Sequence, residues 1–179
     1  MGAYLSGFCT SAANDNEQII FKKKKNVTAG FLFYISTTNQ SYGRARQQNG
    51  YERRPVLVKG NVGERAGDHM RRGTILIEGN AGDYCGSRMT AGTIAVMGQT
   101  GRYAGYAMRR GTLLLWNPLQ LSATFNDCGA HTLGFLPMLF ASFKSLNSRF
   151  ADAAVSFNRV RRYAGDMAEM GRGEVLVKL

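Results

Sequence analysis

Short apolar pairs recur along the middle of the chain at a spacing of 19 residues. Within each pair the two side chains alternate with a neighbour at a period of two, which is typical of a short β-strand. The pairs are Val56 and Val58, Ile75 and Ile77, Ile94 and Val96, and Leu113 and Leu115. The pattern therefore predicts four short strands at equal intervals.

Glycine follows the same spacing. Residues 60–116 divide into three rows of 19 residues without a gap, and six columns are filled alike in all three rows. The columns are Gly60/Gly79/Gly98, Gly63/Gly82/Gly101, Gly67/Gly86/Gly105, Gly73/Gly92/Gly111, Met70/Met89/Met108 and Thr74/Thr93/Thr112. A unit of this length cannot bury its own apolar face, so we expect the rows to stack. This predicts an all-β-dominated fold, a right-handed parallel β-helix of 19-residue coils with glycine at the corners.

The chain after the third row leaves the repeat and later returns to it. Asn117–Pro118 predicts a turn, and a loop is expected through FNDCGAH. Apolar residues at helical spacing predict a helix at about 133–150, which would cap the open end of the coil stack or face a partner. Residues 162–177 then echo residues 102–115 with two extra residues, which predicts a returning coil with a final strand.

Residues 1–54 do not share the repeat. No column of the repeat continues upstream of Val56, although 19–21 and 30–36 are compatible with strands. Polar tracts and the run Lys22–Lys25 are typical of weakly structured segments. We therefore expect an atypical segment over residues 1–54, which can remain disordered, and a glycine-repeat β-helix domain over residues 55–179.

Composition adds charge and a redox context. The chain of 179 residues has a formal net charge of +11, which favours an anionic partner without choosing between nucleic acid, lipid and protein. Three cysteines without a CxxC pair favour a reduced, cytoplasmic setting. No apolar run reaches the roughly 18 residues that a membrane helix needs.

Three stretches carry a resemblance to a known family. They are GERAGDHMRRGTILIEGNAGDYCGSRMTAGTIAVMG, GYAMRRGTLLLWNP followed by FNDCGAHTLGFL, and YAGDMAEMGRGEVLV. Residues 55–179 resemble the glycine-repeat domain shared by the C-terminal part of glutamate synthase and by the C-type subunit of formylmethanofuran dehydrogenase. The similarity is closer to the C-type subunit, especially to its relative in the bacterial formyltransferase/hydrolase complex. Family members usually have more glycine coils upstream, whereas here the pattern begins near Pro55.

The resemblance implies a non-catalytic structural subunit in a cytoplasmic complex of one-carbon metabolism. In the methylotroph complex of this family, a formyl group passes from tetrahydromethanopterin to a furan carrier and leaves as formate. In the methanogen enzyme, the molybdenum or tungsten pterin, the iron–sulfur clusters and the hydrolase metals reside in other subunits. The implied partners are amidohydrolase-like and formyltransferase-like subunits and a furan carrier with an acidic tail, and this chain itself binds no cofactor.

Four arginines are the candidate binding residues. Arg71 and Arg72 of the first row occupy the positions of Arg109 and Arg110 in the third. Stacked rows would bring them to one edge, where they could hold carboxylates of a partner or of a carrier tail. The alternative is a solvated corner without a ligand.

Other candidate chemistry is weaker. Cys128 and His131 lack the third and fourth ligands that a metal needs, since His69 and Cys85 lie in different columns. Cys128 as a nucleophile lacks an orienting group beyond His131. Cys85 shares its column with two alanines, which predicts a buried, unreactive thiol. The glycines precede strands and not a helix, so a dinucleotide loop is excluded. Neither catalytic nor metal-binding residues are therefore expected.

Two other functions stay open from the sequence. The first is a detached domain similar to the C-terminal domain of the glutamate synthase alpha subunit, because the glycine repeat alone is shared with it. The second is a basic binding module whose N-terminal arm meets nucleic acid, because Lys22–Lys25 lie near aromatic residues.

Overall fold

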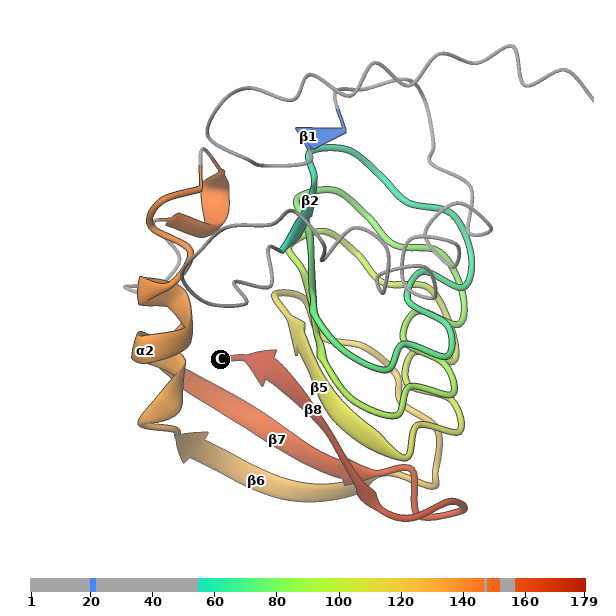
Figure 1. Cartoon of the computed structure of the whole chain (residues 1–179). Coiled ribbons are helices and arrows are strands. Elements are labelled where there is room, and N and C mark those ends of the chain that lie inside the picture. Colours follow the sequence, from blue (N-terminus) through green and yellow to red (C-terminus); the bar gives the residue numbers. More distant parts are fainter. Residues whose placement is uncertain (1–19, 22–54, 147, 152–156) are drawn as a thin grey trace, which may run out of the picture.

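The computed structural model describes residues 20–21, 55–146, 148–151 and 157–179, which fold around one eight-stranded sheet (Figure 1). The strand order in the sheet is β1-β2-β3-β4-β5-β8-β7-β6. The strands are β1 (Ile20–Phe21), β2 (Val56–Val58), β3 (Thr74–Ile77), β4 (Thr93–Val96), β5 (Arg110–Leu115), β6 (Asn126–Thr132), β7 (Arg159–Gly165) and β8 (Arg172–Lys178). One α-helix lies within these described residues, α2 (Phe135–Ala141). The expected dominance of strands is confirmed.

The four predicted strands are present, and each is displaced by one row of the repeat from the one before. In β2–β5 the partners run in parallel, with Val56 opposite Ile75 and Ile75 opposite Ile94. The rest of each row follows the same register, because Val62, Ala81 and Thr100 form bridges in sequence. Figure 1 shows the segments between these strands as loops lying one above another. Equal positions in the three rows are therefore neighbours in space.

Each central strand buries both of its faces. One set of side chains points between the sheet and the stacked turns, where the methionine column of Met70, Met89 and Met108 is also buried. The alternating set packs into a second cluster with aromatic residues from the C-terminal half. Its members include Leu57, Leu76, Ala95, Leu114, Leu176, Phe140, Phe150 and Phe157. A strand covered on both faces needs a continuous apolar run, and TILI and TIAV meet that need.

The helix predicted at 133–150 is present within that range but is shorter. It ends at Ala141, beyond which the chain forms turns and a short 3-10 segment. The apolar spacing continues past the helix because Phe143 and Phe150 enter the same aromatic cluster from these turns. The helix covers the outer face of the sheet and not the open end of the stack, because leucines on that face form the surface on which it packs.

The segment before α2 is a strand and not the predicted loop. Residues 126–132 form β6, which pairs antiparallel with β7. The prediction of a returning coil is also partly wrong, because residues 162–165 lie in β7, which runs antiparallel to β8. The final strand is as expected, since β8 pairs in parallel with β5. The sheet is therefore mixed. The pairings along β1-β2-β3-β4-β5-β8 are parallel, and β8, β7 and β6 pair antiparallel at one side.

Among the described residues, one strand lies upstream of Val56, where the sequence showed no repeat column. β1 pairs in parallel with β2, with Ile20 opposite Leu57, in the segment that was compatible with a strand. The rest of residues 1–54, including 30–36, Lys22–Lys25 and Cys9, lies outside the described residues. The division into residues 1–54 and 55–179 therefore stays a prediction.

We expect Gly79→Ala to destabilise the fold, because a Cβ at this position would lie 2.5 Å from the carbonyl oxygen of Gly60 and from Asn61 Oδ1. Separating the two rows should cost about 2–3 kcal/mol in the free energy of unfolding, measured by urea denaturation. Gly134→Ala is the matched control, because no described atom lies within 4 Å of its Cβ. Equal stability of the two variants would contradict the close approach of the rows.

Candidate functional site

The structure brings the four candidate arginines to one edge of the stack. The carbonyl oxygen of Met70 accepts hydrogen bonds from the N–H groups of Thr90 and Ala91, and that of Met89 accepts from the N–H groups of the third-row arginines. Arg71 and Arg109 therefore share one column, and Arg72 and Arg110 share the next. Strand pairing adds a residue that was not among the four candidates, because Arg172 of β8 lies opposite Arg110.

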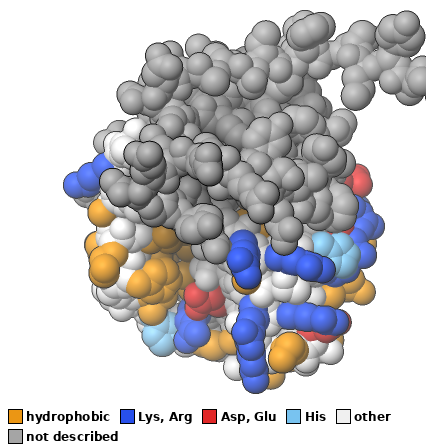
Figure 2. Space-filling model, viewed as in Figure 1, with side chains coloured by type: hydrophobic (Ala, Val, Ile, Leu, Met, Phe, Trp, Pro, Cys, Tyr) orange, Lys and Arg blue, Asp and Glu red, His pale blue; other side chains and the backbone are white. Residues whose placement is uncertain are grey.

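These five side chains, which we call the arginine edge, carry little compensating charge. They are Arg71, Arg72, Arg109, Arg110 and Arg172, and all five are exposed. Arg109 Nε donates a hydrogen bond of 3.2 Å to Glu169 Oε2. In the described part of the chain the other four have no ion pair. Figure 2 shows basic side chains gathered on one face, beside a hydrophobic area. The edge can bind anionic groups.

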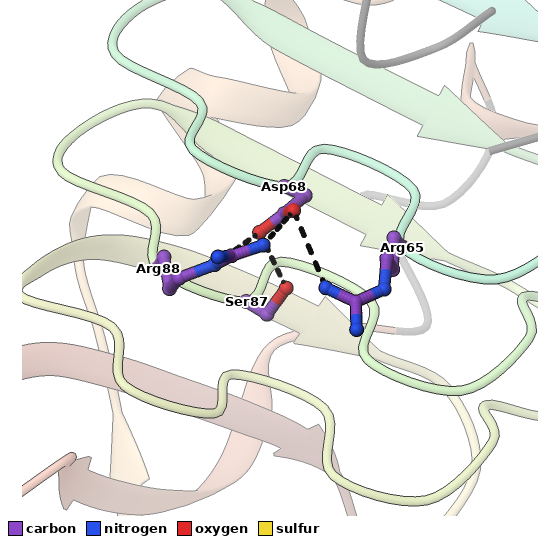
Figure 3. A network of polar contacts seen from close by, with 4 residues as sticks. All are labelled: Arg65, Asp68, Ser87 and Arg88. Carbon is purple, nitrogen blue, oxygen red and sulfur yellow. Dashed lines mark hydrogen bonds and ion pairs between the residues drawn. The ribbon is translucent and has the colours of Figure 1, made fainter. Parts of the chain in front are cut away.

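A second polar cluster joins the first row to the second (Figure 3). Asp68 is buried, and its Oδ1 accepts hydrogen bonds from Ser87 Oγ at 2.7 Å and from Arg88 Nε at 3.0 Å. Arg88 also pairs with Oδ2, and Arg65 Nη1 lies 3.8 Å from the same oxygen. Sequence reasoning missed this cluster, although Asp68 and Ser87 occupy one column of adjacent rows.

The cluster holds Asp68 in its ionised form. Burial alone would raise the pKa of this carboxyl, but the hydrogen bonds from Arg88 and Ser87 outweigh it, and the pKa lies below its ordinary value. Ser87 is itself buried and donates its proton to this carboxylate. The cluster is therefore built to fasten two rows together.

Other polar side chains also connect successive rows. Asn61 Oδ1 accepts a hydrogen bond of 2.8 Å from the N–H of Asn80, and Asn80 Oδ1 does the same for Gln99. Three positions further along the row, Asp83 Oδ1 accepts a hydrogen bond from the N–H of Arg102 at 2.8 Å. These contacts satisfy backbone groups at the corners, where no strand continues.

Aromatic rings form a ladder beside the Asp68 cluster. Arg65 lies 5.1 Å from the ring centre of Tyr84, which stacks on Tyr103 at 5.0 Å. Tyr106 meets Tyr84 edge to face at 5.9 Å. The ladder gives this surface a fixed shape, because stacked rings and a paired guanidinium restrict one another.

The cysteines and histidines show no assembled site among the described residues. Cys85 is fully buried as predicted, and burial raises the pKa of its thiol to about 12. Cys128 is half-buried in β6, where its carbonyl oxygen lies 2.8 Å from His131 Nε2 in a hydrogen bond. The described residues contain no group of three or more His, Cys, Asp or Glu side chains placed to hold a metal ion.

Comparison with known proteins identifies the class of repeat. Residues 47–129, which include the three rows of the glycine repeat, match the GXGXG motif family. No curated protein matches the chain. Within the described residues, no helix has the length and apolarity needed to cross a membrane.

A solved structure gives the more particular likeness. The chain is 40% identical to a chain in the crystal structure of the formyltransferase/hydrolase complex (FhcABCD) from Methylorubrum extorquens in complex with methylofuran. The superposition has a TM-score of 0.65 and covers 75% of this chain and 50% of that chain. The chain thus spans about half the length of this relative, and the resemblance to such a complex is confirmed.

Replacing Asp68 with Asn should lower stability by about 1–2 kcal/mol at pH 7, because Arg88, which is itself partly solvated, loses a charged partner. The folded-state pKa of Asp68 is depressed. Its contribution is therefore present above the unfolded value of about 3.9 and is lost as the pH falls through the folded pKa. Urea denaturation between pH 7 and pH 2 measures this loss in the wild type.

Glu64→Gln is the matched control for Asp68→Asn, because Glu64 is exposed and near the same turn. It should leave the free energy of unfolding at pH 7 unchanged. An unchanged acid dependence in the Asp68→Asn variant would contradict the assignment.

Cys85 should resist alkylation by iodoacetamide at pH 8 in the folded protein, because a thiol with a pKa of about 12 has almost no thiolate at that pH. Cys128 should react, and both should react in denaturant. Mass spectrometry of the peptides separates the two sites. Equal native rates for Cys85 and Cys128 would show that the thiol of Cys85 is accessible.

Proposed function

We propose that this chain is a non-catalytic structural subunit, of the C type, in a formyltransferase/hydrolase assembly of one-carbon metabolism. The observation that carries the proposal is the 40% identity, over 75% of this chain, to a chain of a formyltransferase/hydrolase complex. Because that relative is about twice as long as the matched region, its assembly and its carrier come to this chain as part of the proposal.

The proposal includes the shape of the scaffold, a short right-handed parallel β-helix of 19-residue coils. The support is the constant register of β2–β5 and the bridges that continue it through Val62, Ala81 and Thr100. The side-by-side columns of a coil stack give a rigid surface, since each row is bonded along its length to the next.

The use of polar side chains supports a structural role. Asp68, Ser87 and Arg88 bond to one another across two rows, and Asn61 and Asn80 bond to the backbone of the following row. Side chains that act on a substrate need a face open to it, whereas these are engaged within the stack. We assign the cofactors and metals to other subunits, and we expect a furan carrier and a cytoplasmic location for the assembly.

A tagged copy expressed in its native host tests the proposal. Size-exclusion chromatography after purification should place the chain in a large assembly with formyltransferase-like and amidohydrolase-like subunits, identified by mass spectrometry. The assembly should release formate from a formylated furan carrier. Migration as a free protein would contradict the proposal, and recovery of a glutamine amidotransferase would instead indicate a glutamate-synthase-like domain.

Variants within that assembly test the non-catalytic part. Cys128→Ala and His131→Ala remove the two side chains that resemble a reactive pair, and kcat should stay within about twofold of the wild type. A loss of kcat of about 100-fold or more, in an assembly of unchanged composition, would place chemistry in this chain.

A further inference from the structure

The arginine edge is a product of two different pairings. The register of the repeat aligns Arg72 with Arg110 across the second row, where Ala91 stands between them. The pairing of β5 with β8 then adds Arg172 directly beside Arg110. Neighbouring strands lie about 4.8 Å apart, so the backbones of Arg110 and Arg172 are about 5 Å apart. The backbone of Arg72, two rows away, lies about 10 Å from that of Arg110 on the other side.

The turn between β7 and β8 borders this edge. The carboxylate of buried Asp166 holds the turn against the third row, accepting a hydrogen bond of 3.0 Å from the N–H of Ala107. The same turn presents Glu169 to Arg109 and leaves Met167 61% exposed and Met170 52% exposed. Figure 1 shows this turn beside the first residues of β5 and β8, at the lower right of the molecule and away from α2.

We propose that the arginine edge, together with Met167 and Met170, is the docking surface for a carboxylate-rich segment of another protein subunit that also carries apolar side chains. The inference deepens the proposed function and rests on it only in taking the partner to be a subunit of the same assembly. The charge of the edge supports this occupant, because four of its five exposed arginines have no ion pair in the described part of the chain and leave a positive charge that carboxylates would balance.

Two observations select a protein over another polyanion. Arg109 already binds the carboxylate of Glu169, so the edge accepts this group in the geometry that the backbone imposes. The two methionines add flexible apolar surface, which is typical of protein-binding sites. A phosphate backbone offers no apolar groups that would pack against it. Arginine and methionine are both enriched in protein interfaces.

The test compares two triple variants of the full chain that change the net charge equally. The first, Arg72→Glu/Arg110→Glu/Arg172→Glu, reverses the edge. The second, Lys144→Glu/Arg149→Glu/Arg159→Glu, reverses three exposed side chains near α2 and at the start of β7. The edge variant should bind the other subunits at least about tenfold more weakly, whereas the control should stay within about twofold. Equal binding by both variants would overturn the inference while the proposed function stands.

Two further variants keep the test decisive. Arg72→Gln/Arg110→Gln/Arg172→Gln removes the charge without reversing it, and thermal melting checks that it folds. It should also weaken binding, and wild-type affinity in this variant would overturn the inference. Ala91→Arg completes the column between Arg72 and Arg110 and should strengthen binding.

If the wild-type chain joins no such assembly, the proposed function fails and the edge is tested alone. The probes are a synthetic peptide of alternating glutamate and leucine and a single-stranded DNA of equal charge, each titrated by fluorescence anisotropy. Peptide binding that the edge variant loses supports the docking surface. Loss of DNA binding alone, or no difference between the edge and control variants, overturns it.

Discussion

The backbone hydrogen bonds between successive rows of the repeat are the interaction on which the rest of the structure depends. Each contributes only about 1 kcal/mol net, but together they leave few corner groups without a partner. The rows approach this closely because the corners carry glycine. At Gly92, with φ of +109°, a Cβ would lie 2.8 Å from the carbonyl oxygen of Gly73 and from Met70 Cε. The same missing side chain therefore admits both the neighbouring backbone and the buried methionine.

Burial on both faces of the sheet follows from this stack. One face closes against the turns of the rows, and the other is covered by α2 and an aromatic cluster in which Trp116 contacts Phe140, Phe150 and Phe157. Each buried leucine or isoleucine contributes about 2 kcal/mol from the hydrophobic effect. Since apolar side chains fill both faces, charged side chains collect at the corners, where the arginine edge and the Asp68 cluster lie.

The arginines of these two corner clusters differ in how their charge is balanced. Arg88 is bound to a buried carboxylate within the stack, so its charge is already neutralised. Arg72, Arg110 and Arg172 face solvent without an ion-pair partner among the described side chains, and a chain with a net charge of +11 attracts an acidic partner. The unbalanced charge of the arginine edge, beside rows that are bonded to one another, agrees with the structural role proposed above.

Much of the repeat was predictable because stacking in register turns sequence spacing into spatial neighbourhood. The regularly spaced strands, the buried methionine column and the buried thiol of Cys85 all follow from the columns. Asp68 and Ser87 also share a column, but their hydrogen bond was not predicted. It depends on a turn geometry that directs both side chains inward, and the spacing of the repeat does not reveal that geometry. Arg172 was not among the candidate residues, because two extra residues in the returning segment make its separation from Arg110 along the chain no multiple of the repeat period.

The sequence by itself determined which residues lie in equal positions of successive rows, since local glycine corners and a constant period suffice for that. Only the tertiary structure decided that β6 and β7 form an antiparallel hairpin and that α2 covers the sheet face. It also fixed the register of the expected final strand, β8, on β5, which places Arg172 in the arginine edge. These arrangements depend on pairing between segments with no common period, and such pairing is selected by the apolar surface that remains uncovered once the rows have stacked.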